Sequence, residues 1–180
     1  MDSAGGNWTV IQRRDDIQPR QDFYLGWAEY RRGFGNLTGE FWWGLENMHQ
    51  LTASNDTQYE LRVEMEAFNG DKVYYTYDGF GVSSEDDGYR LRASSVRDSA
   101  WNGLEENVGE KFSTQDRDQD QWTNGSCAQL HRGGWWFWKC GGSNLNGQYH
   151  RDSDPGPRKG IWWFFWSVKK AEMKIRPRLR

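Results

Sequence analysis

The strongest constraint on the fold is the stretch from Gln58 to Ala67, in which apolar and charged residues alternate. The apolar positions are Tyr59, Leu61, Val63, Met65 and Ala67. The positions between them carry Glu60, Arg62, Glu64 and Glu66. Because successive side chains of a strand point to opposite faces, this pattern predicts a β-strand with one buried and one solvated face. The turn sequence Asn69-Gly70-Asp71 then predicts an antiparallel partner over residues 72–77.

The first half of the chain contains patterns that predict further short elements. Residues 8–13 and 89–93 are rich in strand-forming side chains and predict two more strands. An amphipathic helix is predicted to begin near Asp22 and to end at Gly33 or Gly35. It rests on aromatic residues at helical spacing, namely Phe23, Trp27, Tyr30 and Phe34. Residues 39–52 predict a short strand and a helix ending near Leu51. We therefore expect an α+β fold, an antiparallel sheet with short helices beside it.

The half of the chain after about residue 95 predicts little regular structure before a last strand over residues 171–177, which ends at Pro177. With 12 tryptophans and 21 glycines among 180 residues, and a mean hydropathy of −1.02, the core must be built from aromatic rings. A long irregular region of this kind needs a disulfide or a metal to hold it. The length predicts one domain over residues 1–180, with a helix-and-sheet part at 1–95 and an irregular, loop-rich part at 96–180.

Two features indicate an extracellular protein. Four glycosylation sequons begin at Asn7, Asn36, Asn55 and Asn124. Cys127 and Cys140 lie 13 residues apart in a loop-rich region, where a local disulfide is favoured over two buried thiols. A zinc site is disfavoured, because none of the three histidines has a suitable spacing. No stretch approaches the ~20 apolar residues of a membrane span, and the net charge of −3 gives no reason to expect nucleic-acid binding.

An acidic loop containing Asp116, Asp118 and Asp120 precedes the first cysteine. It is not an EF-hand, because the sixth position is Gln121 instead of glycine and the twelfth is Cys127 instead of glutamate. Closely spaced carboxylates and carbonyls still suit a hard cation, and Ca²⁺ is favoured outside the cell. A solvated acidic turn is the alternative.

Several other groups have an ordinary structural interpretation. The aromatic run Trp135–Trp138 is expected to be mostly core, with one or two rings exposed. The basic residues between Lys169 and Arg180 are expected to form a solvated strand face. No serine lies in a nucleophile-elbow motif, and neighbouring aspartates of one loop do not face each other across a substrate cleft. We therefore expect no catalytic activity.

Several long motifs carry a family resemblance. They are "WTVIQRR", "GFGNLTGEFWWGLENMHQLT", "YELRVEM", "KFSTQDRDQD", "GGWWFWKC", "SNLNGQY" and "EMKIRP". Their order resembles the fibrinogen C-terminal-like domain of fibrinogen chain ends, ficolins, tachylectins, tenascin ends and angiopoietin-like proteins. The resemblance covers nearly the whole chain, but no segment of it resembles the small N-terminal subdomain usual in that family.

The resemblance implies a bound Ca²⁺ held by the carboxylates of Asp118 and Asp120 and by the backbone carbonyls of Trp122 and Asn124. It also implies a Cys127–Cys140 disulfide that braces this site. In lectin-type relatives the peptide bond before the second cysteine is cis, which here would be Lys139–Cys140.

The resemblance further implies that residues 96–180 are the calcium- and ligand-binding part of the domain. It implies a ligand pocket beside the loop, formed by His131, Phe137, Cys140, Gly141 and Arg158. Lectin branches that bind an acetyl group place a histidine where this chain has Gly141 and a small residue where it has Arg158. An acetyl pocket needs a small apolar floor and aromatic walls, so these changes argue against ficolin-type acetyl binding. The stretches "CGGSNLNG" and "RKGIWW" are closer to angiopoietin-like proteins.

From the resemblance we expect a secreted, non-catalytic recognition module, stabilised by Ca²⁺, that binds glycan or protein ligands in lectin-like innate-immune recognition. The alternative is an angiopoietin-like or matrix-type domain that binds proteins or receptors. The expected partners are therefore glycans or extracellular proteins, and oligomerisation would depend on segments outside this chain.

Overall fold

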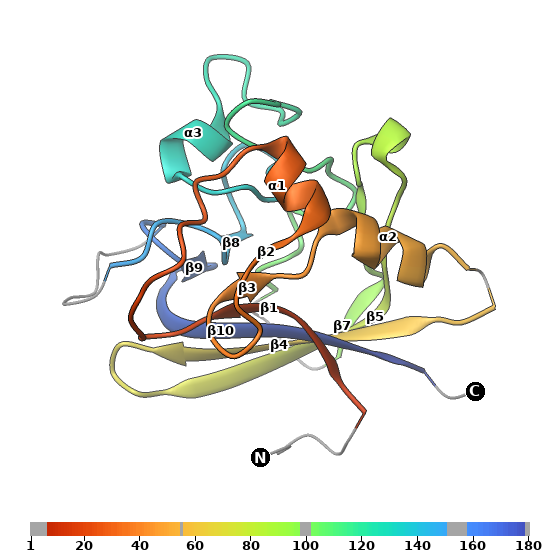
Figure 1. Cartoon of the computed structure of the whole chain (residues 1–180), viewed down its shortest axis with the longest axis horizontal. Helices are drawn as coiled ribbons and strands as arrows, with labels where there is room; N and C mark the ends of the chain where they lie inside the picture. The colour runs from red at the N-terminus through yellow and green to blue at the C-terminus, as the bar shows by residue number, and fades with distance from the viewer. Residues whose placement is uncertain (1–6, 55, 98–101, 151–157, 179–180) are drawn as a thin grey trace.

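The computed structural model describes residues 7–54, 56–97, 102–150 and 158–178 (Figure 1). One antiparallel sheet has the strand order β2-β3-β1-β10-β4-β5-β6, with β7 paired to β5, β8 to β9 and β9 to β10. The strands are β1 Thr9–Arg14, β2 Phe34–Gly35, β3 Phe41–Trp42, β4 Tyr59–Ala67, β5 Lys72–Val82, β6 Leu91–Arg92, β7 Ser95–Arg97, β8 Ser143–Asn144, β9 Trp162–Trp163 and β10 Trp166–Pro177. The helices are α1 Trp27–Arg32, α2 Leu45–Thr52 and α3 Cys127–His131, with a 3₁₀ turn at Glu85–Asp87.

The predicted hairpin of β4 and β5 is confirmed, and it shapes the centre of the sheet. Val63 of β4 lies opposite Tyr75 of β5, and both are buried. The last strand, β10, is longer than predicted and lies between β1 and β4. The end of the chain therefore completes the sheet that the first half begins, as the blue strand of Figure 1 shows. The α+β prediction is confirmed.

The predicted helix from Asp22 was too long at its start. α1 begins only at Trp27, because Gly26 is extended, with φ −88° and ψ 180°. Phe23 is still buried, but a hydrogen bond from the Tyr30 hydroxyl to its carbonyl holds it outside the helix. The helix ends at Gly33 as predicted; φ there is +96°, and a Cβ would lie 2.6 Å from the Trp43 carbonyl oxygen.

The predicted strand at residues 89–93 is shorter in the structure. Only Leu91 and Arg92 pair with β5, because Tyr89 takes a left-handed backbone conformation with φ +50°. Its ring is buried and packs against Trp27, with ring centroids 5.6 Å apart.

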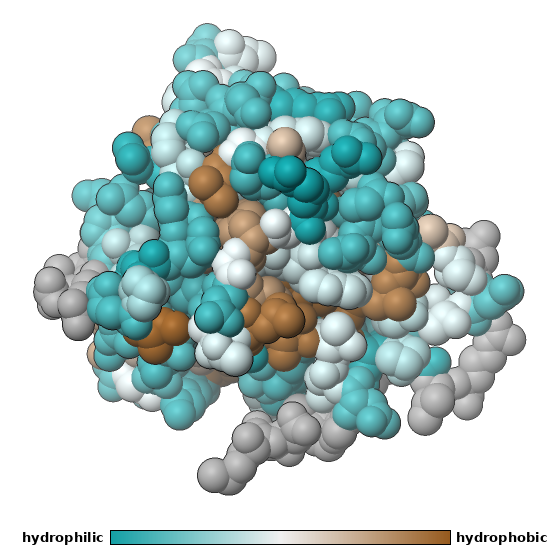
Figure 2. All heavy atoms as spheres, viewed as in Figure 1, coloured by the Kyte–Doolittle hydropathy of each residue, from teal (hydrophilic) through white to brown (hydrophobic). Residues whose placement is uncertain are grey.

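The core is aromatic, as the composition predicts. Five tryptophans are at most 1% exposed, namely Trp42, Trp135, Trp136, Trp162 and Trp163. Phe112 lies among them, with its ring centroid 5.7 Å from Trp42 and 5.1 Å from Trp136. Trp138 is 39% exposed, so the interpretation of the run as core with one exposed ring is confirmed. Figure 2 shows a mainly hydrophilic face on which hydrophobic atoms form small groups.

The predicted solvated face of basic residues near the chain end is confirmed only in part: Lys174 is buried, whereas the other basic side chains that the structure describes there are partly exposed. Their partners are carboxylates of neighbouring strands and loops. The pairs are Lys169–Asp16, Lys170–Asp15, Lys174–Glu64, Arg176–Glu60 and Arg178–Asp78. Among the described helices, none has the length and apolar character that crossing a bilayer requires.

Candidate functional site

A disulfide anchors the candidate site. Cys127 opens α3 and is bonded to Cys140, with their Cα atoms 5.2 Å apart, so neither cysteine is free. Ser126 caps the helix by accepting a hydrogen bond from the Gln129 backbone N–H. The disulfide thus ties the acidic loop before α3 to the segment that carries Gly141. By the chain-entropy account a loop of this length contributes about 3 kcal/mol of stability.

The three aspartates of the acidic loop do not act together. Asp116 accepts hydrogen bonds from the Trp27 backbone N–H at 2.9 Å and the Thr114 hydroxyl at 2.7 Å. Burial raises the pKa of Asp116, but these hydrogen bonds outweigh it, so the net pKa is lowered. Asp116 therefore supplies the side-chain cap that α1 lacks within its own segment. Sequence spacing alone gave no sign of this role.

Asp118 and Asp120 lie side by side. Asp118 accepts the Asp120 N–H at 3.2 Å, while the two carboxylate oxygens of Asp120 accept the N–H groups of Trp122 and Cys127, each at 2.8 Å. Burial raises the pKa of Asp120, and the neighbouring Asp118 carboxylate adds to the effect. Because each carboxylate oxygen has two lone pairs, acceptor positions remain for a cation.

The remaining ligands of a cation would have to be neutral. Among the described residues, no group of three or more His, Cys, Asp or Glu side chains could hold a metal ion. The predicted neutral ligands are the backbone carbonyls of Trp122 and Asn124, and Trp122 O accepts a long 3.4 Å bond from the Gly125 N–H. A site with two carboxylates, carbonyls and water suits Ca²⁺ better than a transition metal.

The residues assigned to a ligand pocket lie at different depths. Phe137 is fully buried and forms an inner wall. His131 covers it, with ring centroids 6.1 Å from Phe137 and 4.5 Å from Trp162. Burial lowers the pKa of His131 to about 4, so its ring is neutral at physiological pH. Arg158 is exposed, and its guanidinium lies 5.5 Å from the centroid of the Phe165 ring.

A residue that the sequence did not indicate occupies the space beside Gly141. A Cβ at Gly141 would lie 2.1 Å from Oε2 of Glu106, so any larger residue there would displace the Glu106 carboxylate. The position at which lectin-type relatives would carry a histidine side chain is therefore taken by a carboxylate from an irregular segment far away in the chain. No local pattern around Glu106 signals this contact.

The backbone near Cys140 differs from the lectin-type expectation. Within the described residues the cis peptide bond is Gln18–Pro19, and Lys139–Cys140 is trans. The expected cis bond is thus wrong. The chain turns here through left-handed conformations at Cys140, φ +61°, and Gly142, φ +79°.

Three of the four predicted glycosylation sites lie on the described surface. Asn7, Asn36 and Asn124 are exposed and therefore accessible to modification, whereas Asn55 lies outside the described residues. Asn36 also accepts hydrogen bonds from Thr38, the third residue of its own sequon.

His131 should make stability depend on pH. Its pKa is about 4 in the folded chain and ~6.5 unfolded, so the unfolded state binds the proton more tightly. The contribution of the neutral His131 ring to the free energy of unfolding is complete above pH 6.5 and is lost as the pH falls towards 4. His131→Phe should remove it, measured as the difference between urea midpoints at pH 7 and pH 5. The exposed His150 provides the control, His150→Phe, which should keep the wild-type difference; equal behaviour of the two variants would contradict the assignment.

Comparison with known proteins identifies the family to which the chain belongs. The family model described as "Fibrinogen beta and gamma chains, C-terminal globular domain" matches residues 1–178. Fibrinogen C domain-containing protein 1 of Macaca fascicularis is 43% identical over 98% of this chain, which spans 42% of that protein's length.

Two solved structures have the same fold. The fibrinogen-like globe domain of human ANGPTL2 is 40% identical, with a TM-score of 0.88 over 98% of this chain and 82% of that one. Lamprey fibrin D-dimer, complexed with the peptide Gly-His-Arg-Pro-amide, is 33% identical, with a TM-score of 0.82 over 96% of this chain and 62% of that one. The aromatic core, the short helices, the disulfide and these matches together show that the chain belongs to the family of fibrinogen C-terminal globular domains.

Proposed function

We propose that the chain is an extracellular, non-catalytic recognition domain that binds a protein ligand on the surface around Gly141, in the angiopoietin-like or matrix manner. The observation that carries this proposal is the Glu106 carboxylate beside Gly141. The sequons and the disulfide support an extracellular location.

The chemistry of Glu106 favours a ligand that presents hydrogen-bond donors or a positive charge. Placing an acetyl methyl group against a carboxylate strips water from the charge without replacing its hydrogen bonds, which is costly. An amine or guanidinium of a protein segment makes charge-assisted hydrogen bonds there instead. The related lamprey fibrin binds a peptide that carries both groups, Gly-His-Arg-Pro-amide.

We also propose that Ca²⁺ binds at Asp118 and Asp120 and stabilises this surface without contacting the ligand. The raised pKa of Asp120 beside Asp118 supports the proposal, because a divalent cation neutralises the repulsion between the two carboxylates. The backbone N–H of Cys127 donates to Asp120, so the ion would be linked through one residue to the disulfide and from there to Gly141.

A lectin-like innate-immune role is the second candidate. Trp138 favours it, because this ring is 39% exposed next to the disulfide and aromatic faces stack on sugar rings. If this second candidate function is correct, the surface around His131 and Gly141 holds an acetylated sugar despite Glu106.

Two immobilised probes separate the candidates. In Ca²⁺-containing buffer we expect retention by Gly-His-Arg-Pro-amide and none by N-acetylglucosamine resin. Glu106→Gln should weaken peptide binding about tenfold because it removes one charge-assisted contact. Glu105→Gln, an exposed neighbour, should leave it unchanged. Retention by the sugar resin with elution by free N-acetylglucosamine would replace the protein-ligand proposal with the lectin one.

A further inference from the structure

A concave surface lies next to Arg132, the residue that follows α3. It is a cleft of about 310 Å³, formed by the segment between β1 and α1, the residue after α3 and the chain around Tyr149. The segment between β1 and α1 rises along the left side of the view in Figure 1, past α3. We call this surface the Arg132 cleft and define it by Arg20, Tyr24, Arg132, Gln148 and Tyr149. Its volume is within the range of small-molecule sites.

Two arginines stack on two tyrosines in this cleft. The Arg20 guanidinium lies 3.4 Å from the Tyr149 ring centroid, and that of Arg132 lies 4.7 Å from the Tyr24 ring centroid. Each stack holds a planar group of donors against an aromatic ring. Planar donors and aromatic edges are the groups that bind polar, ring-shaped ligands.

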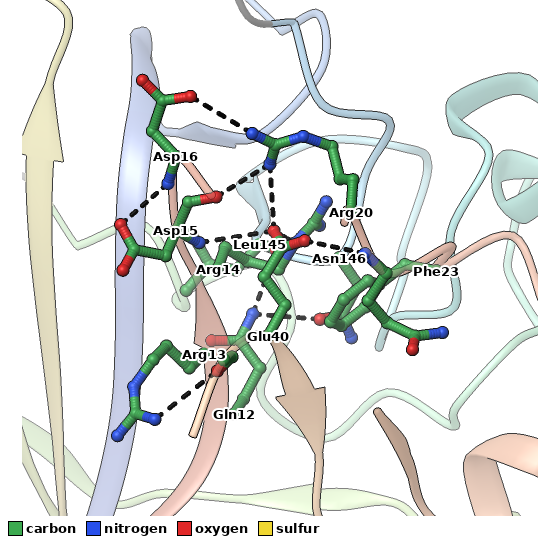
Figure 3. A network of polar contacts seen from close by, with 12 residues as sticks. Gln12, Arg13, Arg14, Asp15, Asp16, Arg20, Phe23, Glu40, Leu145 and Asn146 are labelled. Carbon is green, nitrogen blue, oxygen red and sulfur yellow. Dashed lines mark hydrogen bonds and ion pairs between the residues drawn. The ribbon is translucent and has the colours of Figure 1, made fainter. Parts of the chain in front are cut away.

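The inner wall of the cleft is a rigid, neutralised network (Figure 3). Arg14 is buried and donates to the carbonyls of Leu145 and Gly147 and to Glu40. Arg20 pairs with Glu40 and with Asp16. These two cations therefore have carboxylate partners, and they position the cleft without leaving a free charge in it.

Arg132 differs from them because it is exposed and forms no ion pair or side-chain hydrogen bond with any residue that the structure describes. Its backbone is fixed: φ is +53°, and its N–H donates to the Ala128 carbonyl at the end of α3. The carboxylate that lines the same cleft, Asp22, is engaged by the Tyr24 N–H. The guanidinium of Arg132 is thus presented on a fixed backbone, and no described residue occupies its donors.

The groove on the outer face of the sheet provides a contrast. It is lined by more charged residues than the Arg132 cleft, but its cations are paired, for example Arg13 with Glu172 at 2.8 Å and Arg62 with Glu64 at 2.6 Å. A ligand there would have to break existing ion pairs. In the Arg132 cleft it would not.

We propose that the Arg132 cleft binds the acidic group of a saccharide, a carboxylate or a sulfate. Arg132 takes the oxyanion through two of its donors, which matches the geometry of these planar or tetrahedral groups. The tyrosine edges and the exposed Gln148 amide face the ring and its hydroxyls. A saccharide is favoured over a phosphopeptide, because most of the lining side chains are polar or charged and, apart from the buried Phe23, its aromatic rings are tyrosines. This site goes beyond the proposed function, because its lining includes neither Gly141 nor Glu106 and it needs no Ca²⁺.

The test compares three octasaccharide probes on the intact chain by surface plasmon resonance. They are a sulfated heparin octasaccharide, an unsulfated heparosan octasaccharide that keeps its carboxylates, and neutral maltooctaose. We expect binding of the acidic probes in EDTA and none of maltooctaose. Tighter binding of the heparin probe assigns a sulfate, and equal binding assigns a carboxylate.

The decisive variant is Arg132→Asn, because asparagine accepts the left-handed backbone that ends α3 while removing the cation. It should weaken the acidic probes at least tenfold with an unchanged melting temperature, and Arg132→Lys should restore part of the loss. Arg32→Ala is the matched control, since its side chain is 72% exposed and lies outside the cleft.

Three outcomes would overturn the proposal. Equal losses for Arg132→Asn and Arg32→Ala would mean unspecific charge attraction. Binding unaffected by Arg132→Asn would place the site elsewhere. Arg132-dependent binding of a phosphotyrosine peptide, with no binding of the acidic octasaccharides, would replace the saccharide by a phosphopeptide. None of these depends on Glu106 or Ca²⁺, so the proposed function is tested separately.

Discussion

Replacing Glu40 by alanine should lower the free energy of unfolding by about 3–5 kcal/mol, the cost of leaving a buried charge without its partner. The side chains of Glu40 and Arg14 are each 1% exposed and lie 3.3 Å apart. Glu40 also accepts from Arg20 and from the backbone N–H of Gln21. Burial lowers the pKa of Arg14 and Glu40 opposes that shift, which shows how much the cation depends on this carboxylate. Urea unfolding at pH 7 measures the loss.

Glu172→Ala is the matched control for this prediction. Glu172 also forms ion pairs, with Arg13 at 2.8 Å and with Lys174 at 3.7 Å, but its side chain is 26% exposed. Solvent can replace the contact with Arg13, and Lys174 keeps its 2.9 Å contact with Glu64. We expect a change of about 1 kcal/mol or less. A Glu40 variant no less stable than the Glu172 variant would mean that water enters the network and solvates Arg14. Arg14→Met combined with Glu40→Leu should recover part of the loss, because it removes both charges together.

The elements with strong local periodicity were predictable from the sequence. The alternation around Val63 fixed the face that β4 buries, and it did so without knowledge of its partners. The start of α1 was not predictable, because the residues before Trp27 have helical spacing but are held extended by contacts with distant residues. Asp116, far along the chain, caps the helix at Trp27. Tertiary contacts of this kind decide element boundaries.

The residues of the candidate site likewise divide into those that local spacing predicts and those that only the fold brings together. The spacing of Asp118, Asp120 and the cysteines is local, and it identified a loop whose carboxylates do lie together and whose disulfide does form. The groups that give the neighbouring surfaces their chemistry are not local. Glu106 reaches Gly141 from an irregular segment, and Arg132 is distinguished only by the carboxylate it lacks among the described residues. Which charges remain unpaired depends on the fold, and no window of sequence contains that information.

Removing Ca²⁺ should destabilise the chain by about 4 kcal/mol when the free ion is 1,000-fold above its dissociation constant, since binding stabilises only the folded state. The two carboxylates of Asp118 and Asp120 would repel each other again without the ion. Thermal unfolding in EDTA and in excess Ca²⁺ measures the difference. Because the pKa of Asp120 is raised, protons should compete with the ion at a higher pH than for an ordinary aspartate, so the difference should shrink as the pH falls.

Asp118→Ala should abolish the difference between EDTA and Ca²⁺, because it removes one of the two charged ligands. The matched control is Asp116→Ala in the same loop. Asp116 binds the Trp27 N–H and the Thr114 hydroxyl instead of facing the other carboxylates. Its loss should cost about 1 kcal/mol, as for other helix caps, equally in EDTA and in Ca²⁺. If the wild type does not respond to EDTA, or if Asp118→Ala still responds fully, the loop is an acidic turn that stabilises the site through hydrogen bonds alone.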